Sequence, residues 1–271
     1  MSLTSAPDSN LITAAGTHPG ETGKNNEDRF AVLFFRAPGG EPVTVGLVCD
    51  GVGGHSAGEV ASDMAVRLIS EQIARGAGDY PAVFTQAVAA ASAQIAELAE
   101  ANLQQRGMAT TCAIALVHGR RLYTAYVGDS RLYLYRRASG RLRQISVDHT
   151  WLQAAVEHGL IRPEEMASHP NQHVLLRHLG GKTDAQADLR IKLTETETPA
   201  ESEANQGLRL EAGDTVLLCS DGLSDLVRAD EIEQALAGAL LQPAVDGLID
   251  LARQRGGFDN ITIVVMRVPG A

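Results

Sequence analysis

Aromatic residues and cysteines are scarce in this 271-residue sequence, which has one tryptophan, 4% aromatic residues and three cysteines. Cys49, Cys112 and Cys219 lie in separate apolar runs without the CxxC spacing of zinc and redox sites, so we expect buried free thiols. An odd cysteine count without a signal-peptide pattern is typical of a reducing compartment. The resulting prediction is a cytoplasmic protein.

Basic residues are also in the minority, because 23 Lys and Arg stand against 33 Asp and Glu and give a net charge of -10. A surface of this sign does not suit a nucleic-acid backbone, so nucleic acid is excluded as the expected partner. No uncharged apolar run approaches the roughly 18 residues of a membrane helix, so no membrane partner is expected either. With 44% hydrophobic residues the chain has enough apolar material for a sizeable core.

Strand patterns and helical patterns occur in separate blocks. Short apolar runs predict strands at 11–17, 29–35, 43–49, 109–119, 121–128, 132–137, 141–145, 214–220 and 260–268. Helical periodicity is found at 60–73, 84–98, 151–158 and about 230–254. Because strict β-α-β alternation is absent, the pattern favours antiparallel sheets flanked by helices.

In two segments the apolar residues show neither helical nor strand periodicity. Residues 1–10 are polar and are predicted to form a disordered N-terminal segment, and residues 11–271 are predicted to form one domain. The acidic segment 195–206 is interrupted by proline and is predicted to be a solvated loop.

Aspartates at the ends of apolar strands are the main chemical signal. Three strands run into Asp50, Asp129 and Asp221, and a fourth strand begins just after Asp259. The end of one strand lies beside the start of its antiparallel neighbour, so these carboxylates can meet at one rim. Each Asp-Gly pair alone is a common turn signal. Together, four converging carboxylates would repel one another unless a hard divalent cation lay between them, which predicts a metal site.

The glycine-rich run 50–59 follows the first of these strands. It does not match GxGxxG, so it does not predict a dinucleotide site. His55 lies within it and is either a structural histidine or a general acid beside the carboxylates. Glu27 and Asp28 directly precede another strand and, alone, would be only a solvated turn.

The strongest signal is a series of motifs in order between residues 11 and 268: NNED, VCDGVGGHSAGE, TT at 110–111, VGDSR, DHT, LLRHLGG, CSDGLSDLV and DNITIVV. In this order the chain resembles the metal-dependent serine/threonine protein phosphatases of type 2C, in their compact bacterial form. The resemblance implies an α+β fold, a four-layer α-β-β-α sandwich of two antiparallel sheets flanked by helices, with a flap near 160–190. It also implies hydrolysis of phosphoserine and phosphothreonine on proteins, opposing a serine/threonine kinase.

The resemblance further implies two Mn²⁺ or Mg²⁺ ions and a weaker third. The implied ligands are Asp50 bridging two ions, the Gly51 carbonyl, Asp221 and Asp259, with Asp129 and Asp221 at the third ion. Glu27 and Asp28 would hold metal-bound waters. Asp50 and His55 are the implied catalytic residues, His55 or a metal-bound water protonating the leaving alkoxide after an activated water attacks phosphorus.

One position departs from the family pattern. The family's phosphate-binding arginine is replaced by Gly23, and the adjacent Lys24 is the candidate substitute, although a point charge cannot reproduce a bidentate fork. This departure keeps a second class open, a non-catalytic phosphoprotein-binding module. A third class, a metal-dependent phosphodiesterase or nuclease, is disfavoured by the acidic charge. The expected partners of a phosphatase are phosphorylated proteins, a kinase and that kinase's substrates, and we expect a monomer.

Overall fold

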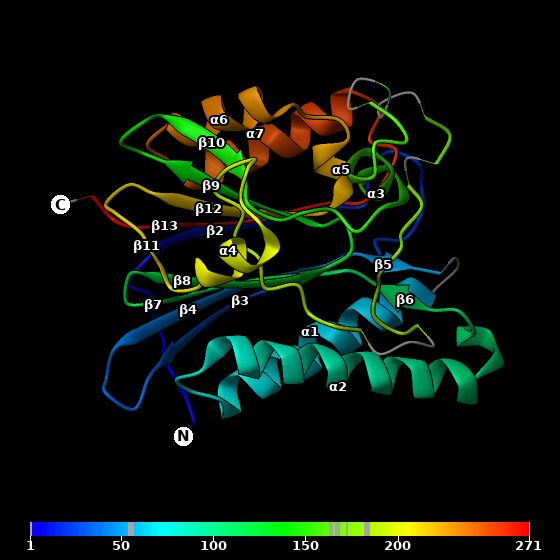
Figure 1. Ribbon diagram of the computed structural model, residues 1–271, viewed down its shortest axis with the longest axis horizontal. Helices are drawn as coiled ribbons and strands as arrows, with labels where there is room; N and C mark the ends of the chain where they lie inside the picture. The colour runs from blue at the N-terminus through cyan, green and yellow to red at the C-terminus, as the bar shows by residue number, and fades with distance from the viewer. Residues whose placement is uncertain are drawn as a thin grey trace.

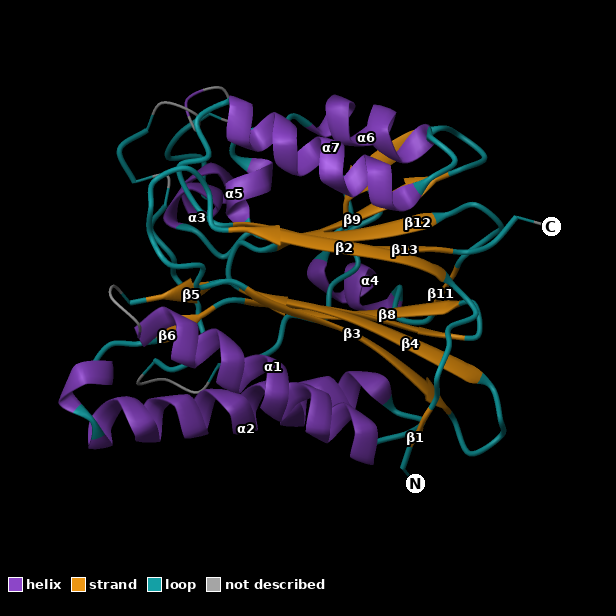
Figure 2. Ribbon diagram, turned by 180° about the vertical axis from the view of Figure 1, so that it is seen from behind, coloured by secondary structure: helices purple, strands orange, loops and turns teal. Residues whose placement is uncertain are grey.

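Two antiparallel sheets face each other and helices cover both outer faces (Figure 2), in a computed structural model that describes residues 2–53, 57–162, 165, 169–171, 173–181 and 185–270. The predicted four-layer α-β-β-α sandwich is therefore confirmed.

The first sheet contains β1 (Thr4–Ser5), β3 (Arg29–Arg36), β4 (Pro42–Cys49), β7 (Cys112–His118), β8 (Arg121–Val127) and β11 (Leu208–Arg209), in that spatial order. The second contains β10 (Arg141–Gln144), β9 (Arg131–Arg136), β12 (Thr215–Cys219), β13 (Ile261–Arg267) and β2 (Ile12–His18), also in spatial order. The short strands β5 (Gly51–Val52) and β6 (Ala109–Thr110) pair with each other.

Each sheet buries both of its faces. The helices α1 (Ala57–Arg75) and α2 (Tyr80–Ala101) cover the first sheet, and α5 (Asp221–Ser224), α6 (Ala229–Ala237) and α7 (Leu241–Gln254) cover the second. In β4, Leu47 packs toward the helices while the next residue, Val48, packs between the sheets. This alternation is the period of two expected of a strand buried on both sides. Cys49, Cys112 and Cys219 are buried and free, as predicted.

The predicted loop over 195–206 is wrong in its centre, where α4 (Pro199–Ala204) forms. Thr198 accepts a hydrogen bond from the Glu201 amide, the Glu201 side chain accepts from the Thr198 amide, and Pro199 occupies the first turn. This capping box and the proline stabilise the start of the helix, although its apolar residues do not follow a helical period. The remaining described helices are η1 (Leu103–Gln105) and α3 (Trp151–Glu157).

The N-terminal residues also differ from the predicted disorder. Leu3 is 7% exposed and packs in the core beneath the first sheet, and its amide donates to the Ala74 carbonyl at 2.9 Å. The next two residues form β1, which pairs with β3. Burial of Leu3 and the backbone hydrogen bonds of its neighbours place this segment on the first sheet, a tertiary effect that composition does not reveal.

Helix α2 has the length and the apolar composition of a membrane span, contrary to the expectation that no apolar run approaches that length. Its Tyr80, Phe84, Val88 and Ile95 are fully buried against the first sheet and α1. The structure therefore uses the apolar face of α2 as part of the core.

Candidate metal centre

One end of the sandwich, at the right of Figure 1 where β5, β6 and α5 lie, collects the acidic residues identified from the sequence. Asp50 follows β4, and Asp28 precedes β3, whose Arg29 pairs with Cys49 at the end of β4. Asp221 follows β12, and Asp259 precedes β13, the antiparallel partner of β12. The predicted meeting of strand ends and strand starts at one rim is what these registers produce.

The charges of these residues interact strongly. Burial raises the pKa of Asp50 well above its usual range, and the neighbouring charges of Asp28, Asp221, Asp129 and Asp259 raise it further. Burial likewise raises the pKa of Asp221 well above its usual range, again with help from the surrounding carboxylates. Mutual repulsion of this kind shows that the carboxylates are close together in space.

Asp28 and Glu27 line the same cluster from the NNED segment. Burial raises the pKa of Asp28 to about 6, although its Oδ2 accepts a hydrogen bond from the Ser220 hydroxyl at 2.7 Å. Burial, followed by the charge of Asp259, also raises the pKa of Glu27. Burial raises the pKa of Asp129, after β8, to about 6.

Three buried carboxylate oxygens in the described part of the chain have no hydrogen-bond partner: Glu27 Oε1, Asp28 Oδ1 and Asp221 Oδ1. A buried carboxylate oxygen without a donor is unfavourable in a folded protein. Repulsion between carboxylates and unsatisfied acceptor oxygens are both relieved by a hard cation, so this donor set fits Mn²⁺ or Mg²⁺.

Two glycines allow the chain segments to approach one another at this rim. A Cβ at Gly51 would lie 2.2 Å from the Gly58 carbonyl oxygen, and a Cβ at Gly222 would lie 2.1 Å from the Asn260 carbonyl oxygen. Only a glycine fits either position. The second contact packs residues 220–222 directly against residues 259–260.

The backbone of Asp50 is anchored by the threonine pair. The Asp50 amide donates to Thr111 Oγ1 at 2.9 Å, and the Asp50 carbonyl accepts from the Thr110 hydroxyl at 2.8 Å. Thr111 Oγ1 also lies 2.6 Å from Ser130 Oγ, next to Asp129. This anchoring role was not predicted from the sequence, where the threonine pair is only one part of the resemblance.

Asn260 joins three loops at the rim. Its side-chain oxygen accepts from the Glu27 amide at 2.7 Å, and its side-chain amide donates to the carbonyls of Pro19 and Asn25 at 3.0 and 3.1 Å. The asparagine of the DN motif thereby fixes the NNED segment beside Asp259.

Asp225 and His173 are candidate ligands that were not predicted from the sequence. One ligand atom from each of His173, Asp221 and Asp225 lies within 4.8 Å of the other two. Asp225 follows Asp221 by four residues, the spacing that places two side chains on one helix face, and recognition of α5 would have revealed the pair. No sequence signal indicated His173.

The three other predicted residues are His55, Lys24 and Gly23. His55 lies outside the described residues. Lys24 is exposed, and its charge partly opposes the rise in the pKa of Glu27 that burial causes. Gly23 has a φ of 74° and no atom within 4 Å of a Cβ placed on it, so open space occupies the position of the family arginine.

Part of the predicted flap packs against the body of the protein. Leu175 and Leu179 form β-bridges with Thr150 and Thr110. A pocket of about 870 Å³ lies between this segment and the end of α2, with Leu103, Met108, Leu176, Arg177 and His178 among its lining residues.

Comparison with known proteins agrees with this architecture. Residues 15–254 match the protein phosphatase 2C family. The serine/threonine phosphatase stp of Listeria welshimeri is 32% identical over 92% of this chain and 93% of its own length. The serine/threonine protein phosphatase PstP of Mycobacterium tuberculosis is 38% identical over 82% of this chain, and this chain spans 40% of its length.

A solved structure shares the fold. The catalytic domain of PstP in complex with two manganese ions has a TM-score of 0.76 and 34% identity, and the alignment covers 95% of this chain and 97% of that one. The chain therefore belongs to the protein phosphatase 2C family of serine/threonine phosphatases.

Proposed function

We propose that this protein hydrolyses phosphoserine and phosphothreonine on proteins in a reaction that depends on Mn²⁺ or Mg²⁺. The observation that carries the proposal is the convergence of Asp50, Asp221 and Asp259 at one rim beside buried carboxylate oxygens that lack hydrogen-bond donors. Two bound cations would supply an acidified water near neutral pH and would neutralise the phosphoryl oxygens.

The proposed ligand set is the one that the resemblance to type 2C phosphatases implies, and the position of these residues at one rim supports it. Asp50 would bridge two ions, the Gly51 carbonyl would bind one of them, and Asp221 and Asp259 would hold the other. Glu27 and Asp28 would orient coordinated waters from the NNED side of the rim. A third, weaker ion would lie at Asp129 and Asp221, where Asp225 and His173 offer further donor atoms.

The residues toward the substrate side have separate roles. Lys24 would attract the phosphate in place of the family arginine, whose position is occupied here by Gly23. His55 would give a proton to the leaving alkoxide. Replacing Lys24 by Ala should raise KM for a phosphothreonine peptide several-fold with little change in kcat, because an exposed charge contributes mainly to binding. Lys192→Ala, which removes a surface lysine paired with Glu195, is the matched control.

The wider biological setting completes the proposal. Residues 11–271 would act as one catalytic domain with a flap near 160–190, and its partners would be phosphorylated proteins, including a serine/threonine kinase and that kinase's substrates. A cytoplasmic location and a monomeric state stay predictions.

Turnover of a phosphothreonine peptide across a Mn²⁺ titration tests the function. We expect metal-dependent phosphate release that Asp50→Asn lowers by at least about 10³-fold, as for loss of a principal electrostatic contributor. Asp63→Asn, on the exposed face of α1, should retain full activity. Absence of turnover at every Mn²⁺ concentration, with retained phosphopeptide binding, would instead support the non-catalytic binding module.

A further inference from the structure

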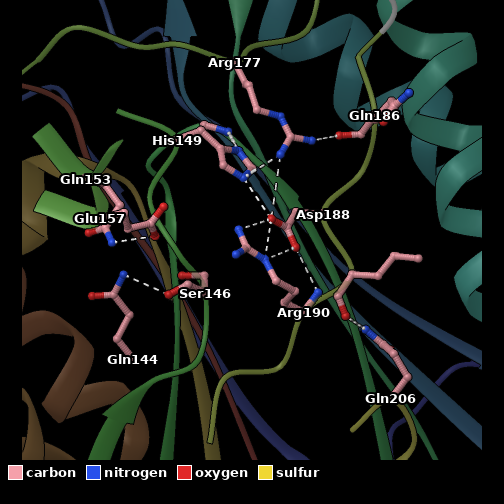
Figure 3. Close-up of polar contacts among 12 residues, drawn as sticks. Gln144, Ser146, His149, Gln153, Glu157, Arg177, Gln186, Asp188, Arg190 and Gln206 are labelled. Carbon is pink, nitrogen blue, oxygen red and sulfur yellow. Dashed lines mark hydrogen bonds and ion pairs between the residues drawn. The ribbon is translucent and has the colours of Figure 1, made fainter. Parts of the chain in front are cut away.

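A buried polar network outside the acidic cluster joins the loop before Asp129 to the flap segment. Figure 3 shows its side chains around Asp188. Asp188 lies at its centre, and His149, Arg177 and Arg190 converge on the Asp188 carboxylate. The side chains of His149 and Asp188 are only 6% and 5% exposed. Burial of this pair strengthens the hydrogen bond between them.

The hydrogen bonds fix which nitrogen of His149 carries the proton. The Gly128 amide can only donate, so Nδ1, 3.1 Å away, accepts. Nε2 then carries the proton and donates to Asp188 Oδ2 at 3.0 Å. Arg177 Nη1 is 2.9 Å from the same Nε2, but two donors cannot bond to each other. Arg177 is held instead by the Asp188 charge, 3.7 Å from Nη1, and by the Gln186 carbonyl.

His149 binds Gly128 through both backbone polar groups of that glycine. Besides the bond to Nδ1, the Gly128 carbonyl accepts from the His149 amide at 3.0 Å. That carbonyl belongs to the peptide bond with Asp129, so His149 orients the backbone that carries Asp129. Gly128 has a φ of 103°, and a Cβ there would lie 2.7 Å from Thr111 Cγ2, so this position requires glycine.

The same histidine holds the flap segment. Its carbonyl accepts from the Leu176 amide at 2.8 Å, and the following residue, Thr150, bridges to Leu175. Arg177, next along the segment, is 37% exposed and lines the 870 Å³ pocket. His149 is therefore a direct link between the Asp129 loop and one wall of that pocket.

We propose that His149, held in place by Asp188, is a positioning residue that couples cation binding at Asp129 to the placement of the flap segment 174–179. The proposal rests on the proposed function in one respect, the assignment of Asp129 as a cation ligand. A cation that orders Asp129 also orders Gly128 and, through His149, the Leu176 amide. By reciprocity, an ordered flap segment favours cation binding at Asp129.

Hydrogen exchange in the full-length chain tests the coupling, measured by mass spectrometry on peptides covering residues 174–179 with and without saturating Mg²⁺. In the wild-type protein we expect Mg²⁺ to slow exchange by about tenfold, the range of typical coupling between sites. The effect should vanish in Asp129→Asn. His149→Ala keeps the backbone bonds to Gly128 and Leu176 but loses the ring's bonds to the Gly128 amide and to Asp188, so the effect should fall several-fold there and in Asp188→Asn. It should persist in His158→Ala, which removes an exposed histidine at the end of α3. An undiminished Mg²⁺ effect in His149→Ala overturns the proposal.

Calorimetric titration with Mn²⁺ separates positioning from general loss of structure. His149→Ala should weaken the weakest-binding ion about tenfold and leave the tighter ions unchanged. His149→Asn, whose side-chain oxygen can accept from the Gly128 amide, should recover most of that affinity and carries the test if the alanine variant does not fold. In an Asp129→Asn background, His149→Ala should have no further effect.

The two proposals fail differently. If Asp129→Asn leaves binding of every Mn²⁺ ion unchanged, the positioning proposal is overturned, while the proposed function, which Asp50→Asn tests, still stands. If Asp50→Asn leaves turnover intact, the proposed function fails instead.

Discussion

Asp50 is placed where its charge is least favourable for the apo protein, since burial and the charges of Asp28 and Asp221 all raise its pKa. The cost of ionising it is incurred in the folded state and is absent from the unfolded chain. At the scale of a single residue, therefore, the requirements of cation binding oppose those of stability.

Asp50→Asn should consequently stabilise the protein in the presence of a chelator. We expect the free energy of unfolding at neutral pH to rise by about 1–3 kcal/mol, because one buried like charge is removed. Added Mn²⁺ should raise the Tm of the wild-type protein and not that of the variant. Thermal unfolding with Asp63→Asn as control checks this, and a variant less stable than wild type in chelator would contradict it.

His149 gives a pH dependence of defined sign. Burial lowers its pKa below the usual value, the Arg177 charge adds to this, and the Asp188 hydrogen bond opposes it. The unfolded chain therefore binds a proton as pH falls through about 6.5 while the folded protein does not, and stability falls on acidification.

The measurement is the difference in unfolding free energy between wild type and His149→Asn, because other titrating groups largely cancel in it. The wild-type advantage should shrink by up to about 1.4 kcal/mol per pH unit below about 6.5. A difference that stays constant between pH 7.5 and 5.5 would show that His149 is not held neutral.

Among the structural elements, the short helix α5 packs closely against the segment that leads into β13. Gly222 makes this contact, so Gly222→Ala should force α5 away from Asn260 and cost about 2–4 kcal/mol, in the range of overpacking and backbone displacement. Mn²⁺ affinity should fall as well, because Asp221 moves with α5.

Gly247→Ala provides the matched control within another helix. Gly247 lies inside α7, and no atom lies within 4 Å of the point that an alanine Cβ would occupy, so alanine should stabilise by about 0.5–1 kcal/mol. Chemical denaturation of both variants compares them, and equal effects would contradict the close approach at Gly222.

Elements differ in how far local sequence determines them. The strands ending at Asp50 and Asp221 and the first two helices are predicted correctly because each has a clear period and a turn at its end. Helix α4 was missed because its start depends on the capping box of Thr198 and Glu201 and not on apolar period. Strand β1 was missed because it forms only against β3 and α1.

The residues of the candidate site also differ in how far local sequence predicts them. Asp50, Asp129, Asp221 and Asp259 are marked by the strands beside them, so antiparallel geometry predicts their meeting. His149 belongs to the DHT motif, but its role was not predicted, and His173 and Asp188 carry no local signal, because their contacts join segments far apart in the chain.

For the whole molecule, the acidic cluster spans both sheets. Asp50 extends from the first sheet, and Asp221 and Asp259 extend from the second. Cations bound by these three carboxylates would crosslink the two sheets at one end. The sandwich should therefore be more resistant to opening when cations are bound.

We expect Mn²⁺ at 100 times its dissociation constant to add about 2.7 kcal/mol to the free energy of unfolding. Unfolding monitored in denaturant with increasing Mn²⁺, and with chelator as the reference, measures this. Stabilisation of wild type and Asp50→Asn by the same amount would place the ions elsewhere.

The pairing of β2 with β13 has a consequence for synthesis of the protein. Strand β2 lies at the edge of its sheet, and its partner in the described sheet is β13. The register pairs Ile12 with Arg267, which is made 255 residues later. The strand that follows Asp259 is thus also the strand with which β2 must pair. In a nascent chain that has not yet formed β13, the second sheet is incomplete and Asp259 is not yet held beside Asp221. Under the proposed function, we therefore expect phosphatase activity to begin only once translation of this domain is finished.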